Sequence, residues 1–198
     1  MTENFEPRDL AERLNLIESM IAEGRRTTKN WGWTFVLWGV AYYVAIGWAA
    51  LGHPALAWPV TMSAAGVITG MVASRRDHNK TSTTLGRAMA AIWISFGISI
   101  FLLMMSLTWS RHIDSFASVA IVCAMLGMAN ATSSIILRWK VQFACALVWW
   151  ASAVAACFVS DSVCTTIFLV AIFLCQIVFG IYGMLAISRQ HKQGAAHA

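Results

Sequence analysis

Residues 31–76 read WGWTFVLWGVAYYVAIGWAALGHPALAWPVTMSAAGVITGMVASRR and set the pattern for the rest of the chain. One apolar stretch leads into the turn Gly52-His53-Pro54, and a second apolar stretch follows and ends in two arginines. A helix of about 20 apolar residues crosses the roughly 30 Å of hydrocarbon in a bilayer. The segment therefore predicts a helical hairpin in a membrane.

The same pattern recurs twice further along the chain. Tryptophans recur about 55 residues apart, at Trp38, Trp93 and Trp149, and so do the pairs Gly70-Met71, Gly127-Met128 and Gly183-Met184. Six apolar stretches contain no Asp, Glu, Lys, Arg or His, at about 31–52, 55–74, 88–110, 115–137, 141–160 and 162–188. We predict an all-α membrane protein with six transmembrane helices within residues 30–188. They are arranged as three consecutive hairpins, at about 31–76, 86–138 and 139–188.

Composition and charge agree with this class. The chain is 59% hydrophobic and 12% charged, whereas soluble domains average about a quarter charged residues. All lysines and arginines except Arg111 lie at the termini or in the loops of one side. Because such residues mark the cytoplasmic side, both termini are expected there. The net charge of +5 is thereby explained without a nucleic-acid partner.

The N-terminal segment, residues 1–29, predicts a cytoplasmic amphipathic helix. Its apolar residues have helical spacing and form one stripe, which consists of Leu10, Leu14, Ile17 and Ile21. Gly24 is expected to stop the helix before a basic juxtamembrane cluster of Arg25, Arg26 and Lys29. The stripe should dock on the cytoplasmic face of the bundle or on a second protomer. The tail, residues 189–198, is expected to be disordered.

Small residues predict close helix packing. Gly66 and Gly70 form a GxxxG motif, a spacing that lets two helices approach closely. It fits either packing inside one bundle or a contact between protomers. We assign the same packing role to Gly127, Gly180 and Gly183.

Uncharged polar side chains collect on the second, fourth and sixth apolar stretches. The candidates for a polar cavity are Asn130, Thr132, Ser133, Gln176 and Tyr182, of which Asn130 and Gln176 are the most polar. Such groups need partners in hydrocarbon, so they predict either hydrogen bonds between helices or a neutral polar cavity.

Ionisable side chains inside a span are the usual mark of ion coupling or catalysis, and the six stretches have none. We therefore expect no enzyme, no cofactor and no metal. His53 and His112 in the outer turns are expected to be exposed loop residues, with a shared outer site as the alternative. The five cysteines lack CxxC spacing and are interpreted as packing residues.

The segments NWGWTFVLWGVAYYVA, AWPVTMSAAGVITGMVASRR, AIWISFGISI and IILRWKVQFACALVWW give the chain a family likeness. Over about residues 14–188 it resembles a family of small, uncharacterised six-helix bacterial membrane proteins. This resemblance implies the bacterial cytoplasmic membrane and six helices, and supplies no activity. A weaker resemblance, to the hairpin repeats of HdeD-type membrane proteins, rests on Gly39, Gly47, Pro54, Gly66 and Gly70, and the N-terminal helix departs from it.

These features predict a non-enzymatic integral membrane protein of the bacterial inner membrane. It would act by self-association, as a homo-oligomer, or by contact with a protein partner, in a regulatory or scaffold role. The alternative is a passive pore or carrier for a small neutral or apolar solute.

Overall fold

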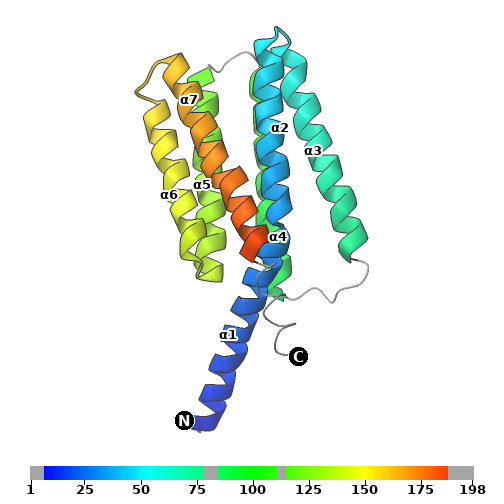
Figure 1. Ribbon diagram of the computed structural model, residues 1–198, viewed down its shortest axis with the longest axis vertical. Coiled ribbons are helices and arrows are strands. Elements are labelled where there is room, and N and C mark those ends of the chain that lie inside the picture. Colours follow the sequence, from blue (N-terminus) through cyan, green and yellow to red (C-terminus); the bar gives the residue numbers. More distant parts are fainter. Residues whose placement is uncertain (1–6, 78–83, 111–114, 187–198) are drawn as a thin grey trace.

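The computed structural model describes residues 7–77, 84–110 and 115–186, and every regular element in these ranges is a helix. The helices are α1 (Pro7–Asn30), α2 (Gly32–Ala50), α3 (Pro54–Asp77), α4 (Thr84–Ser110), α5 (Ser115–Leu137), α6 (Lys140–Ala156), α7 (Asp161–Ile172) and the π-helix η1 (Phe173–Val178). The helix continues beyond η1 over residues 179–186. Figure 1 shows helices α2–α7 side by side in a bundle, with α1 projecting from one end.

Five of the helical segments are long and apolar enough to cross a membrane, which is the pattern of a multi-pass membrane protein. They are Gly32–Ala50, Leu56–Arg75, Leu85–Leu107, Phe116–Leu137 and Asp161–Ala186. The all-helical class is thus confirmed. The fifth predicted span, 141–160, corresponds to α6, which is apolar but has 17 residues and ends at Ala156. At 1.5 Å per residue, α6 is about 25 Å long.

Two tight turns connect neighbouring helices, the first at the predicted Gly52-His53-Pro54 turn and the second at the boundary of the second and third predicted hairpins. Between α2 and α3, Gly52 has φ +96°, a backbone conformation that glycine adopts without steric cost. Between α5 and α6, only Arg138 and Trp139 intervene, and Arg138 has φ +48°. The backbone N–H of Trp139 donates to the carbonyl of Ser134 at 2.9 Å and closes this turn.

The Gly52 turn gives a direct test of backbone geometry. We expect Gly52→Ala to lower the free energy of unfolding by about 1–3 kcal/mol, because an L side chain is strained at this φ. Chemical unfolding in detergent would measure the change. Within the described part of the chain, no other atom lies within 4 Å of a Cβ built on Gly52, so an unchanged stability would mean that the turn does not hold this conformation.

The prediction that Gly24 stops the first helix is wrong, because α1 continues to Asn30. Gly24 is buried at the crossing of α1 with α4 and α5. A Cβ there would collide with Leu85 and would lie 2.8 Å from Cδ2 of Leu137. This glycine therefore permits close packing of α1 on the bundle rather than ending the helix.

The helix contacts are not confined to the three predicted hairpins. α2 packs along α3, as the first hairpin predicts, but the most extensive helix pair is α5 with α6. The sequence assigns these two helices to different hairpins. Their two-residue connection at Arg138 holds them antiparallel and close over their length.

Two chains of aromatic rings run through the bundle. The Trp58 band links α3, α2, α7 and α6 through the ring pairs Trp58–Tyr42, Tyr42–Phe168 and Phe168–Trp149, with centroids 5.7–6.3 Å apart. The Trp93 band links α4, α2, residues 179–186 and the start of α6 through Trp93–Phe35, Phe35–Phe179 and Phe179–Trp139, at 5.1–5.3 Å. Each band connects four helical segments, and such ring pairs add to the stability from burial.

Candidate functional site

A group of uncharged polar side chains is buried between the two aromatic bands. It consists of Asn130 and Ser133 on α5, Gln142 on α6 and Gln176 in η1, and their exposed fractions are 0%, 0%, 0% and 3%. We call these four residues the polar layer. Its three amides are every Asn and Gln between residues 84 and 186 of the sequence, and all three are buried.

Contacts between α6 and the C-terminal helix place the two glutamines at one level. Three contacts set the register: the ring pairs Trp149–Phe168 and Trp139–Phe179, and between them the Cys175 thiol, which donates to the Cys145 carbonyl at 3.6 Å. Gln142 precedes Cys145 by three residues, and Gln176 follows Cys175 directly. Both glutamines therefore lie in the interval between the bands.

The register of α5 on α6 places Asn130 and Ser133 within about two helical turns of the level of Gln142. Gly127 lies beneath the indole of Trp150, and the chain reverses at Arg138. Asn130 and Ser133 are one and two helical turns closer to that reversal than Gly127. They consequently face the part of α6 that carries Gln142 and the residues just after it.

Most of the hydrogen-bonding atoms of the polar layer have no partner among the described residues. The Asn130 amide nitrogen donates to the Leu126 carbonyl at 2.9 Å. The unpartnered buried atoms include Asn130 Oδ1, Ser133 Oγ, Gln142 Oε1 and Nε2, Gln176 Oε1 and, at the edge of the layer, Trp149 Nε1. A buried polar atom left unpaired costs about 1–3 kcal/mol, so this concentration calls for a physical explanation.

The layer coincides with an irregular helix. Residues 173–178 form a π-helix, a geometry that occurs mostly as single turns and frequently at functional sites. Gln176 within it is approached by α2, because a Cβ built on Gly39 would lie 3.0 Å from Cβ of Gln176. α2 therefore packs against the layer at Gln176.

The structure divides the residues predicted to line a polar cavity. Asn130, Ser133 and Gln176 share the polar layer, whereas Thr132 and Tyr182 are exposed on the surface of the chain. Sequence reasoning missed Gln142, which belongs to the layer. The available signal was that Gln142 is the most polar side chain of the fifth apolar stretch.

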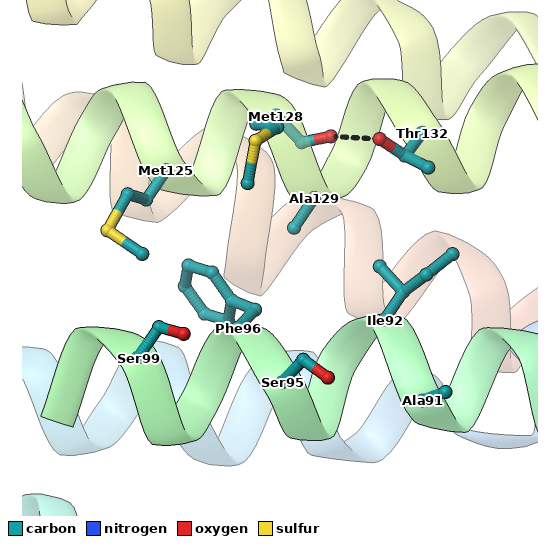
Figure 2. A pocket seen from close by; sticks show the side chains of 9 residues that line it. All are labelled: Ala91, Ile92, Ser95, Phe96, Ser99, Met125, Met128, Ala129 and Thr132. Atoms are coloured by element: carbon teal, nitrogen blue, oxygen red, sulfur yellow. Dashed lines mark hydrogen bonds between the residues drawn. The ribbon is translucent and has the colours of Figure 1, made fainter. Parts of the chain in front are cut away.

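Thr132 instead lines an open groove between α4 and α5, with a volume of about 400 Å³. Figure 2 shows Phe96 of α4 pointing across the groove toward α5, with Ser95 and Ser99 on the same helix as Phe96. The Thr132 hydroxyl donates to the Met128 carbonyl at 2.9 Å. The groove is thus lined by two methionines, Phe96, Ile92 and small or hydroxyl side chains, without a charged group.

The glycines assigned to helix packing fall into two classes. Gly127 lies against Trp150 at the α5–α6 interface, and a Cβ on Gly180 would lie 2.7 Å from the carbonyl oxygen of Gly32 on α2. Gly183 is also buried. Gly66 and Gly70 are exposed on α3, and a Cβ at either would meet no atom of the described residues within 4 Å. Packing of this GxxxG inside the bundle is therefore not observed, which leaves the contact between protomers as a prediction.

The N-terminal stripe is exposed rather than docked along the bundle. Leu14 and Ile17 are 55% and 52% exposed, and Ile21 is half-buried. The structure does not describe the side chains of Leu10, Arg25, Arg26 and Lys29. His112 and residues 189–198 also lie outside the described residues. Two apolar residues that the prediction omitted, Leu16 and Met20, are exposed beside the stripe.

The described ranges hold no group of three His, Cys, Asp or Glu side chains that could bind a metal ion. The five cysteines are free thiols, and all but Cys157 are buried. No family model, curated protein or solved structure matches this chain.

Proposed function

We propose that this protein is a non-enzymatic membrane protein that acts by self-association through α1. The observation that carries the proposal is an apolar arc on α1 outside the bundle. The arc consists of Leu14, Leu16, Ile17 and Met20, which are 55%, 62%, 52% and 39% exposed. Figure 1 shows this part of α1 extending away from the other helices.

An exposed apolar arc on an isolated helix is unfavourable in water. A helix of this length is marginal by itself, and helices in proteins gain most of their stability from packing an amphipathic face. The sequence of residues 1–23 is rich in Asp and Glu, which disfavours lying on an anionic lipid surface. A second copy of α1 offers the complementary apolar arc, so two copies together would cover both.

We further propose six spans with both termini in the cytoplasm of a bacterium, in its inner membrane. The distribution of charge supports this orientation. Arg75, Arg87, Arg138 and Lys140 are exposed at the ends of α3, α4, α5 and α6. These ends share the side of the bundle from which α1 projects (Figure 1), and positive residues mark the cytoplasmic side. For α6 to complete the sixth span, the residues after Ala156 would have to contribute.

The open face of α3 supports a second contact between protomers. Gly66 and Gly70 leave a shallow surface on α3 with no neighbouring atoms within the described chain. Close helix approach across such small residues is a common mode of association in membranes. In this proposal, α1 pairs in the cytoplasm and α3 pairs in the bilayer.

The test replaces one residue of the arc by an acid. We expect Ile17→Asp to weaken self-association by about tenfold or more, because pairing would bury an unpaired charge. Ser19→Asp is the matched control, since it adds the same charge on the opposite side of the same helix. Mass photometry or light scattering across a dilution series in nanodiscs would report the oligomer.

Membrane insertion should be the same for both variants, because neither residue lies in an apolar span. An oligomer that survives Ile17→Asp unchanged, or a parent protein that is monomeric at every concentration, would contradict association through α1. Equal losses for Ile17→Asp and Ser19→Asp would point to charge alone and would also reject the apolar arc.

A further inference from the structure

The polar layer has more hydrogen-bonding capacity than the chain around it uses. Its unpartnered atoms are of both kinds: acceptors on Asn130, Gln142 and Gln176, donors on Gln142 and Trp149, and the Ser133 hydroxyl, which can act as either. Buried polar groups in native proteins are satisfied by the chain or by small bound molecules such as ordered water. We propose that the polar layer is a binding site for a small neutral molecule that carries both a donor and an acceptor.

The mixture of donors and acceptors selects a neutral molecule. A cation would pair with the oxygens of the layer but would leave the N–H groups of Gln142 and Trp149 unpaired, and an anion would do the reverse. The sequence from 115 to 137 has no acid or base, and from 141 to 186 it has only Asp161, at the exposed start of α7. A bound ion would therefore lack a counter-charge, and burying an unpaired charge is very costly.

The surroundings of the layer favour an enclosed site over a continuous channel. The Trp58 band lies on one side of the layer and the Trp93 band on the other. α2 approaches at Gly39, within 3.0 Å of Gln176 for a Cβ placed there. Such a site suits a molecule of the size of water, urea or a short alcohol. Water and a small solute share the required chemistry, so the experiment has to separate them.

Two adjacent serines provide matched variants. Ser133 and Ser134 are both buried on α5. The Ser134 hydroxyl donates to the Ala131 carbonyl at 2.7 Å, whereas the Ser133 hydroxyl has no partner in the described chain. If the layer binds a molecule, Ser133→Ala removes a ligand contact. If the layer is dry, the same change removes an unpaired hydroxyl and relieves a cost.

The experiment uses the full chain in lipid bilayers and tests for both candidate ligands, water and a small solute. Water-edited solid-state NMR measures magnetisation transfer from water to the side-chain amides of Asn130, Gln142 and Gln176. Native mass spectrometry from nanodiscs measures any retained neutral mass. We expect one of the two signals: rapid water transfer identifies water, and a reproducible extra mass identifies a solute. Ser133→Ala and Gln142→Leu should cause its loss, and Ser134→Ala should retain it.

The melting temperature of Ser133→Ala distinguishes a layer with a bound molecule from a dry layer. With a bound molecule, Ser133→Ala should lower the melting temperature by about 2–4 °C, and a dry layer predicts no change or an increase. The proposal is overturned if the amides receive water no faster than the apolar side chains around them and no extra mass is retained. It is equally overturned if Ser133→Ala leaves the melting temperature unchanged or raises it. Self-association through α1 is not involved in either result.

Discussion

Replacing Trp149 by alanine is expected to lower the free energy of unfolding by about 3–5 kcal/mol, the usual cost of removing a fully buried large ring. Trp149 has no exposed surface. Its ring lies tilted against that of Phe168, with the centroids 6.3 Å apart, and ends the Trp58 band. The loss should therefore combine burial, a cavity at the junction of α6 with α7, and a broken ring contact. Unfolding by SDS or heat in detergent, followed by circular dichroism, would measure it.

Trp109→Ala is the matched control for this prediction. Trp109 is 86% exposed near the end of α4, so its removal leaves no cavity, and we expect a change within about 0.5 kcal/mol. The comparison separates the effect of burial from that of losing any tryptophan. Similar losses for the two variants would show that the Trp58 band does not stabilise the bundle.

Gly180→Ala is expected to destabilise the bundle by about 1–3 kcal/mol, as overpacking does in tight interiors. The new methyl group would lie 2.7 Å from the backbone carbonyl of Gly32 and 2.8 Å from Cγ2 of Val36. The first of these atoms belongs to the backbone and cannot rotate away. The C-terminal helix would have to separate from α2, which should also loosen the Phe35–Phe179 ring pair of the Trp93 band.

Gly47→Ala should have the opposite effect on stability. Gly47 also lies within a helix, but a Cβ there meets no atom within 4 Å. Alanine is a better helix former than glycine by about 0.5–1 kcal/mol, so Gly47→Ala should be neutral to stabilising. Thermal unfolding of both variants in one detergent checks the pair, and a stabilising Gly180→Ala would disprove the close crossing of the C-terminal helix with α2.

The sequence predicts the features of this fold that depend on local composition. Apolar length predicts the spanning helices, and the Gly52-His53-Pro54 turn and the short connection at Arg138 lie where charge and turn residues interrupt the apolar runs. The prediction that Gly24 ends the first helix is wrong for a physical reason. A glycine ends a helix or permits close packing, and which of these applies depends on Leu85 and Leu137, which are distant in sequence.

The composition of the polar layer could be predicted only in part. Asn130, Ser133 and Gln176 stand out by residue type, but Thr132 and Tyr182 have similar chemistry and point elsewhere. Residue type does not reveal which side of a membrane helix faces its neighbours when nearly all sides are apolar. Gln142 belongs to the layer because α6 packs along α5, and the predicted hairpins place these two helices in different units.

The π-helix at residues 173–178 also affects how this chain can tolerate insertions and deletions. A π-turn accommodates one residue more than the α-helical path around it. Deleting a single residue within 173–178 would let the segment return to a regular α-helix, and residues 179–186 would keep their orientation because the π-turn holds the extra residue locally. Phe179 would then keep its ring contacts with Phe35 and Trp139, and Gly180 its close approach to Gly32. A deletion in the regular helices would instead rotate every following residue by about 100°, so this short segment is where the C-terminal helix tolerates the loss of one residue best.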